Sequence, residues 1–271
     1  LTASTPRTKI LTHPIFLTHI ISSEHPESPE RIKYILDYIK KYDLINLLEI
    51  VETDRLVGKW IKRIHSDSHI SSLKRNNPIA EKVSRYAVKL CLIGVDKILK
   101  KESRSIFCAV RPPGHHALNT GKEEGFCYYN HIAITAEYLK KKYKFKKILI
   151  VDWDYHHGNS TEFFFYDDPS VLFFSTHDLN AYPGTGHPSR NGRGSGLGFN
   201  VNVHLPCRTN DQRILKVFKE VLVPKADRFK PDFILISAGF DSRFDDLLGC
   251  FDVSDNGFRE LTKIITKIAA K

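Results

Sequence analysis

The sequence is poor in residues and segments that mark several common protein classes. Methionine is absent from all 271 residues, and tryptophan occurs only twice. No apolar run approaches the roughly 20 residues that cross a bilayer, and the start LTASTPRTKI has no apolar signal-peptide core. We therefore expect a soluble globular protein in the cytoplasm, or in the nucleus if the source is eukaryotic, with no membrane partner. The missing methionine indicates an unusual composition or positions lost from the sequence, so spacings across loops are lower bounds.

Cysteine is also scarce. The five cysteines are odd in number and widely spaced, with no Cys-x-x-Cys pair: Cys91, Cys108, Cys127, Cys207 and Cys250. This pattern argues against a disulfide framework and against a thiolate zinc site, and it favours a reducing compartment.

Basic residues outnumber acidic ones by 41 to 31, which gives a formal charge of +10. The densest cluster, KKKYKFKK at 140–147, ends the helical pattern NHIAITAEYLKKK, where cations complement the helix dipole. We therefore expect no direct nucleic-acid binding. The positive charge still favours acidic partners, and a homo-oligomer is compatible with the sequence.

The chain alternates predicted helices with short apolar runs. Its length and its 41% hydrophobic content suit one sizeable core, so 1–271 is expected to be a single domain. One helix begins behind Ser28, the predicted cap, with Pro29 in the first helical position, and further apolar stripes predict helices near 83–98, 214–221 and 258–268. The runs at 105–110, 147–151, 171–175, 199–203 and 233–237 have strand length. This order predicts an α/β fold, with an open, mostly parallel, multi-stranded sheet and helices on both faces.

Polar loops follow four of these strands: RPPGHHA, DWDYHHGN, THD and AGFDS. The carboxyl ends of parallel strands meet at one edge of a sheet, and ligands bind there. The four loops are therefore expected to form one site.

Three side chains in these loops suit a metal ion. Asp154 and His156 are two residues apart, so both point to the same side of an extended segment, and Asp241 follows a neighbouring strand. Three protein ligands with an open position are typical of catalytic zinc. The oxygen-rich set would also accept Fe²⁺.

The motifs RPPGHHA, GFCYYN, VDWDYHHGN, YPGTG, FNVNVHLP and ISAGFDS, in this order, resemble the histone deacetylase family, including its bacterial acetylpolyamine deacetylase relatives. The likeness runs from about His25 to the last helix, and DWD and GFD are more similar to the class II and bacterial branches. It implies an arginase/deacetylase-like fold and a hydrolase that removes acetyl groups from protein lysine or from polyamines. It also assigns zinc to Asp154, His156 and Asp241.

The resemblance further implies catalytic roles. His115 and His116 match the tandem histidines that handle protons, and Asp152 matches the carboxylate that orients the first of them. Asn159 stands where class I members have an aspartate as partner of the second histidine. An amide stabilises an imidazolium less than a carboxylate does, so His116 is expected to serve as the general base near neutral pH.

Two other sites follow from the same resemblance. Gly125, Phe126 and Tyr182 match the residues that line the family's substrate channel. A structural K⁺ ion is implied at main-chain and side-chain oxygens of Asp152, Asp154, His156, Ser175 and Thr176.

The chain departs from the family in one respect. Members normally carry a glycine-rich segment ending in tyrosine, or in some cases histidine, that donates to the oxyanion, and no such segment lies between Asp241 and Lys271. We therefore expect the domain to continue past Lys271. Loss of one oxyanion donor costs about 10²–10³ in rate.

Two alternatives remain at this point. An arginase-type ureohydrolase would need two manganese ions and a further aspartate at position 243, which is Arg243. An inactive acetyl-amine binding protein would have no need to keep the ligands and both histidines.

Overall fold

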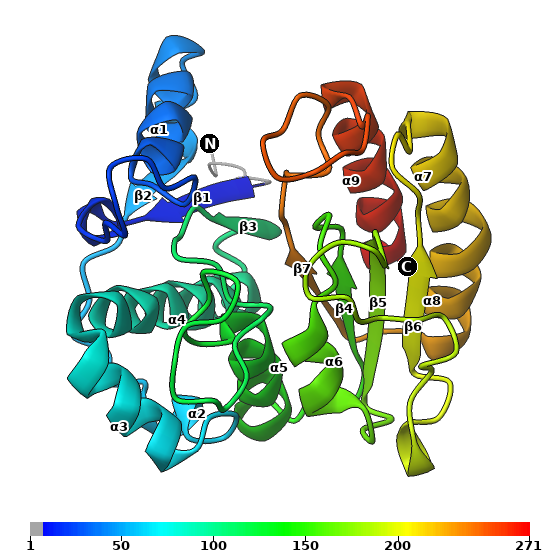
Figure 1. Ribbon diagram of the computed structural model, residues 1–271, viewed down its shortest axis with the longest axis horizontal. Helices are drawn as coiled ribbons and strands as arrows, with labels where there is room; N and C mark the ends of the chain where they lie inside the picture. Colours follow the sequence, from blue (N-terminus) through cyan, green and yellow to red (C-terminus); the bar gives the residue numbers. More distant parts are fainter. Residues whose placement is uncertain (1–7) are drawn as a thin grey trace. The chain divides into compact units, whose positions relative to one another are not determined.

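The computed structural model describes residues 8–271, and Figure 1 shows its elements in chain order. Most of the start LTASTPRTKI, residues 1–7, lies outside the described residues. The chain divides into two compact units, Leu1–Leu139 and Lys140–Lys271, which are described separately below. Within the described residues, none of the helices combines the length and the apolar character needed to span a membrane.

The strands are β1 (Thr8–Thr12), β2 (Leu48–Ile50), β3 (Ser105–Cys108), β4 (Ile148–Asp152), β5 (Val171–His177), β6 (Asn200–His204) and β7 (Phe233–Ser237). The helices are α1 (Glu30–Lys41), α2 (Gly58–Ile61), α3 (Asp67–Asn76), α4 (Pro78–Leu99), α5 (His131–Lys142), α6 (Asn159–Phe165), α7 (Asp211–Val217), α8 (Val223–Phe229) and α9 (Asp255–Ala269). A π-helical turn, Phe218–Leu222, joins α7 to α8.

The first unit contains a three-stranded parallel sheet in the order β2-β1-β3. Leu11 of β1 and Phe16 just after it are fully buried, and they pack with Val83, Ala87 and Leu90 from α4. These three α4 residues follow the spacing of one helix face, so the predicted apolar stripe is the face that covers the core.

A buried ion pair fixes the start of the loop after β3. The side chains of Arg111 and Glu27 are each 1% exposed, and the Nε and Nη2 atoms of Arg111 donate to the two carboxylate oxygens of Glu27 at 2.7 and 2.6 Å. Nη1 donates to the carbonyl oxygens of Phe16 and His19, both at 2.6 Å. The guanidinium therefore links residues 16–19 and Glu27 of the first unit to the RPPGHHA loop.

The second unit contains a four-stranded parallel sheet in the order β6-β5-β4-β7. Asp152, the last residue of β4, is paired with Ser175 of β5 and with Ser237, the last residue of β7. Because these strands end in register, the loops after β4 and β7 leave the same edge of the sheet side by side.

Helices lie on both faces of this second sheet (Figure 1). Leu172 and Phe174 of β5 belong to a buried cluster with residues of α7, α8 and α9, such as Leu261. Phe173 points to the opposite face because side chains alternate along a strand. There its ring contacts His157, two residues before the start of α6.

The predicted elements are largely present, with shifts of a few residues at their ends. The predicted strand at 233–237 is reproduced. The strand at 105–110 ends at 108, the strand at 171–175 extends to 177, and those at 147–151 and 199–203 are each shifted by one residue, to 148–152 and 200–204. Two short strands, β1 and β2, were not predicted. The start of α1 was predicted wrongly: Pro29 is the N-cap rather than the first helical residue, and no side-chain hydrogen bond caps the helix.

The expectation of a chain without disulfides is wrong at one pair. Cys207, after β6, and Cys250, in the loop after β7, form a disulfide with their Cα atoms 5.1 Å apart. The backbone beside them is also joined, because the amide of Arg208 donates to the carbonyl of Cys250 at 2.7 Å. Sequence spacing misses this pair because 43 residues separate two loops that the fold brings together.

Candidate metal centre

The three predicted metal ligands come together at the edge of the second sheet where β4 and β7 end. Asp154 and His156 lie in the loop between β4 and α6, and Asp241 lies in the loop after β7. One ligand atom from each residue lies within 4.8 Å of the other two. Among residues 8–271, this is the one group of three or more histidine, cysteine or acidic side chains with that geometry.

The imidazole of His156 lies between the two carboxylates. Its Nδ1 atom is 2.7 Å from Oδ2 of Asp241 and 3.1 Å from Oδ1 of Asp154. The backbone orients both acids, since the amide of Tyr155 donates to Oδ1 of Asp241 at 2.8 Å and the amide of His156 donates to Oδ1 of Asp154 at 2.7 Å. The DWDYHHG loop thus supplies two of the ligands and also holds the third.

The two carboxylates of this cluster favour a positive charge between them. Burial opposes a charge on His156, but the hydrogen bonds and charges of Asp154 and Asp241 outweigh it and raise the pKa of the imidazole to about 10. Burial, followed by the charge of Asp154, raises the pKa of the Asp241 carboxyl. Either protons or a metal cation can satisfy this requirement.

Two glycines make room for the acidic side chains. A Cβ atom at Gly239 would lie 1.9 Å from Oδ2 of Asp154, and a Cβ atom at Gly158 would lie 2.2 Å from Oδ2 of Asp152. No side chain larger than hydrogen fits at either position without displacing a carboxylate. The glycines of SAGFD and HHGN are therefore part of the support of this site.

The donor set fits a divalent ion such as zinc. Two carboxylates and one imidazole are ligands that zinc accepts, and three protein ligands leave a coordination position for water or substrate. The backbone amides that bond the carboxylates play the orienting role that outer contacts have in metal sites.

The other predicted residues of this unit lie close to the same sheet edge. Asp152, Ser175 and Thr176 are fully buried, and Oδ1 of Asp152 accepts from the amide of Asp154 at 3.2 Å. Within the described residues, the hydroxyl of Thr176 is buried without a hydrogen-bond partner, as a nearby cation would explain. Asn159 is the first residue of α6.

Tyr182 lies in the loop after β5 and is 50% exposed. Its peptide bond to Pro183 is cis. An aromatic side chain with this exposure is available for contact with a ligand.

The tandem histidines belong to the first unit. His115 and His116 are 7% and 3% exposed, and their ring centroids are 3.9 Å apart. Gly114 is required beside them, because a Cβ atom there would lie 2.6 Å from the carbonyl oxygen of Tyr129 and 2.9 Å from the ring of His131. The GHH motif therefore packs tightly against the segment that leads into α5.

Gly125 and Phe126 also belong to the first unit and form a tight turn. Both have positive φ angles, 51° and 69°, and the flanking Glu124 and Cys127 are bridged in antiparallel fashion. The amide of Phe126 donates to the side chain of Glu123, and its ring meets that of His25 edge to face at 4.6 Å. A non-glycine residue with positive φ is uncommon, so the turn holds Phe126 in a specific orientation.

A model of the histone deacetylase domain matches residues 25–271, which cover nearly the whole chain and include parts of both units. The chain belongs to the histone deacetylase family. This membership confirms the family resemblance of the sequence motifs.

Individual relatives of the histone deacetylase family are about one-third identical to this chain. A probable deacetylase of Archaeoglobus fulgidus is 34% identical over 97% of this chain and 77% of its own length. Histone deacetylase 10, chloroplastic, of Oryza sativa subsp. japonica is 34% identical over 91% of this chain, and histone deacetylase 6 of Caenorhabditis elegans is 33% identical over 90%. The alignments span 62% of the rice protein and 29% of the nematode protein. These names support deacetylase activity for this chain.

The fold agrees with a solved member of the histone deacetylase family. The crystal structure of the HDA15 HD domain superposes with a TM-score of 0.91 at 30% identity, covering 98% of this chain and 82% of that chain. The predicted arginase/deacetylase-like α/β fold is confirmed.

Sequence reasoning missed the residues that support the cluster of Asp154, His156 and Asp241 without belonging to it. Gly239 and the amide of Tyr155 act through close approach and a backbone hydrogen bond, neither of which side-chain chemistry reveals. The available signal was the glycine itself, two residues after the apolar strand β7 and two before Asp241.

Proposed function

We propose that this chain is a zinc-dependent amidohydrolase that removes acetyl groups from acetylated amines. The observation that carries the proposal is the Asp154, His156 and Asp241 cluster at the end of β4 and β7, in a chain of the histone deacetylase family. The presence of one such cluster among the described residues favours one metal ion over the two that a ureohydrolase needs. Arg243, where a second metal site would need an aspartate, pairs with Asp255 at 2.7 Å.

A bound zinc ion would polarise the acetyl carbonyl and lower the pKa of water toward about 7. The protein's own groups then have three tasks. His116 takes a proton from the attacking water as general base, and His115 hydrogen-bonds and assists. Asp152 and Asn159 orient the two imidazoles. As the amide C–N bond breaks, the proton taken up by His116 passes to the leaving nitrogen, so acetate and a free amine are the products.

The remaining predicted residues have supporting roles in this proposal. Gly125, Phe126 and Tyr182 hold the alkyl tether of the substrate, which is either a protein lysine or a polyamine. A K⁺ ion near Ser175 and Thr176 would stabilise the carboxyl end of β5, and the unpartnered Thr176 hydroxyl supports that assignment.

Two variants separate metal binding from proton transfer. Asp241→Ala is expected to lose the metal, as measured by elemental analysis of the purified protein, because one of three ligands is removed. His116→Ala is expected to keep the metal and to lose turnover of both an acetyl-lysine peptide and an acetylated polyamine. Full metal content in Asp241→Ala would refute the ligand assignment, and a metal-free His116→Ala would refute the separation of roles.

A further inference from the structure

The first unit contains a basic pocket whose lining residues belong to none of the deacetylase motifs. It has a volume of about 610 Å³ and is lined by the segment from Arg55 to Lys59 and by Arg85 and Lys89 of α4. We call it the Lys59 pocket. Its volume lies within the range of about 300–1,000 Å³ that is usual for small-molecule sites.

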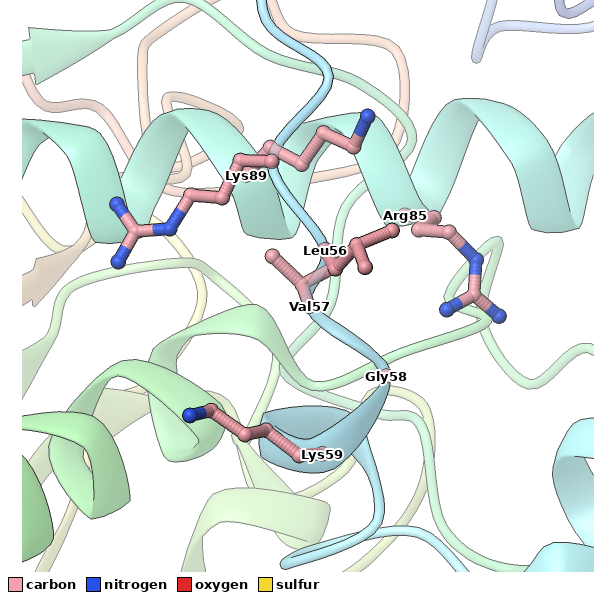
Figure 2. A pocket seen from close by; sticks show the side chains of 7 residues that line it. Leu56, Val57, Gly58, Lys59, Arg85 and Lys89 are labelled. Carbon is pink, nitrogen blue, oxygen red and sulfur yellow. The ribbon is translucent and has the colours of Figure 1, made fainter.

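The lining of the Lys59 pocket offers hydrogen-bond donors and no side-chain acceptor. Four of its seven residues are lysine or arginine, and the others are leucine, valine and glycine. Figure 2 shows Lys59 extending from α2 on one side and Arg85 and Lys89 from α4 on the other, with Leu56 and Val57 between them. A ligand that fills this space meets cations and an apolar surface, so its chemistry must be anionic with an apolar part.

Carboxylates outside the lining hold the two guanidinium groups in place. Arg55 donates to Asp96 at 2.8 Å, and Arg85 donates to the buried Glu81, yet neither acid lines the pocket. Each guanidinium has five N–H donors, so both keep donors for a ligand. The Nη1 atom of Arg85 is the atom that a Cβ at Gly58 would meet, at 3.9 Å, so this nitrogen faces the pocket. Side chains already fixed in position lose little entropy on binding.

The two lysines are less fully neutralised. The Nζ atom of Lys89 donates to the carbonyl oxygen of Thr53 at 3.2 Å. Burial lowers the pKa of its ammonium group; the charge of Asp54 opposes this shift, and the charge of Arg85 adds to it. Lys59 is exposed, and its ammonium lies 5.1 Å from the ring centroid of Trp60. An anion in the pocket would add the missing countercharge.

The apolar part of the lining is also exposed. Leu56 is 89% exposed, while Val57 beside it is 1% exposed. An apolar group of the ligand that covered Leu56 would remove this side chain from water.

We propose that the Lys59 pocket binds an organic phosphate, with the phosphate on the cationic donors and an apolar group against Leu56. A phosphate monoester carries about −1.5 to −2 charges at neutral pH and three acceptor oxygens. A carboxylate offers fewer acceptors to four donors, and arginine forks match phosphate geometry well. This proposal does not depend on the deacetylase function, because binding is measured without turnover.

The test is calorimetric titration of the full chain with phenyl phosphate and with inorganic phosphate. We expect saturable binding at one site, tighter for phenyl phosphate. Lys59→Gln and Lys89→Gln are each expected to weaken phenyl phosphate binding by about tenfold, the loss typical of a hydrogen bond between charged groups. Leu56→Ser is expected to abolish the preference for phenyl phosphate over phosphate.

The matched control is Lys82→Gln, an exposed lysine of α4 that does not line the pocket. It is expected to leave both affinities unchanged. Lys59 is exposed, so its replacement leaves no buried group without a partner and the variant should fold. Three results would overturn the proposal: no saturable binding by the native chain, equal weakening by Lys82→Gln, or tighter binding of a short single-stranded oligonucleotide through the same lysines.

Discussion

The support that Gly239 gives to the metal centre can be tested with a single methyl group. In Gly239→Ala, the added Cβ would lie 1.9 Å from Oδ2 and 2.5 Å from Cγ of Asp154, whereas ordinary contacts begin near 3.4 Å. With the backbone of Gly239 in place, the carboxylate must therefore move by about 1.5 Å to reach an ordinary contact distance. Metal–ligand distances tolerate deviations of only about 0.2 Å. The displacement consequently removes Asp154 from the set of ligands.

The expected loss in metal affinity is at least about 100-fold, or about 2.7 kcal/mol. This is the upper end of the 10–100-fold range for replacing groups that merely orient a ligand, and here a ligand itself is displaced. The φ angle of Gly239 lies outside the left-handed region, so alanine causes no backbone strain of its own. The effect is therefore specific to the carboxylate.

The assay is a competition titration of zinc against a chromophoric chelator, with elemental analysis of the purified proteins. Gly58→Ala is the matched control, since its new Cβ would meet only Arg85 Nη1 at 3.9 Å, an ordinary contact. Thermal unfolding of both variants with excess chelator shows whether the metal-free chains fold alike. A zinc affinity of Gly239→Ala within threefold of the native chain would refute the reasoning.

Two further predictions concern stability. Burial lowers the pKa of His65 to about 3 and that of His131 to about 4, below the value of 6.5 in the unfolded chain. The contribution of the two neutral histidines to the unfolding free energy is therefore complete above pH 6.5 and is lost as the pH falls toward 4. Urea unfolding should show a loss of about 1.4 kcal/mol per histidine for each pH unit below about 6, and a constant unfolding free energy from pH 7 to 5 would contradict this. Cys207→Ser opens a loop of 43 residues and should lower the unfolding free energy by about 4 kcal/mol without reductant. The difference from the native chain should vanish in dithiothreitol, and its persistence there would show that the bond with Cys250 is not its cause.

Much of the architecture was predictable because its signals are local. Buried strands such as Ile148–Asp152 are continuous apolar runs before polar loops, and α4 and α9 carry apolar residues at helical spacing. The grouping of Asp154, His156 and Asp241 was predictable for a related reason: these residues lie in the loops that follow two of the strands, and parallel strands bring their carboxyl ends to one edge.

What could not be predicted depends on contacts distant in sequence. The three-residue strand β2 is too short for any periodicity, and it exists because β1 offers it a partner. The Cys207–Cys250 bond and the room that Gly239 leaves for Asp154 likewise arise only once the chain has folded. Pro29 was misplaced by one residue because prolines suit both the cap and the first turn.

The buried pair of Arg111 and Glu27 has a consequence for how this sequence changes over generations. Replacing either partner alone leaves an uncompensated charge in the interior, a loss of about 3–5 kcal/mol, which is a large part of the stability of an ordinary domain. Intermediates with one replacement are therefore removed by selection, and only a simultaneous change at both positions survives. Two residues 84 positions apart are thereby inherited as a unit. We expect them to covary among relatives that keep the GHH loop, while the exposed Arg31, which also contacts Glu27, varies freely.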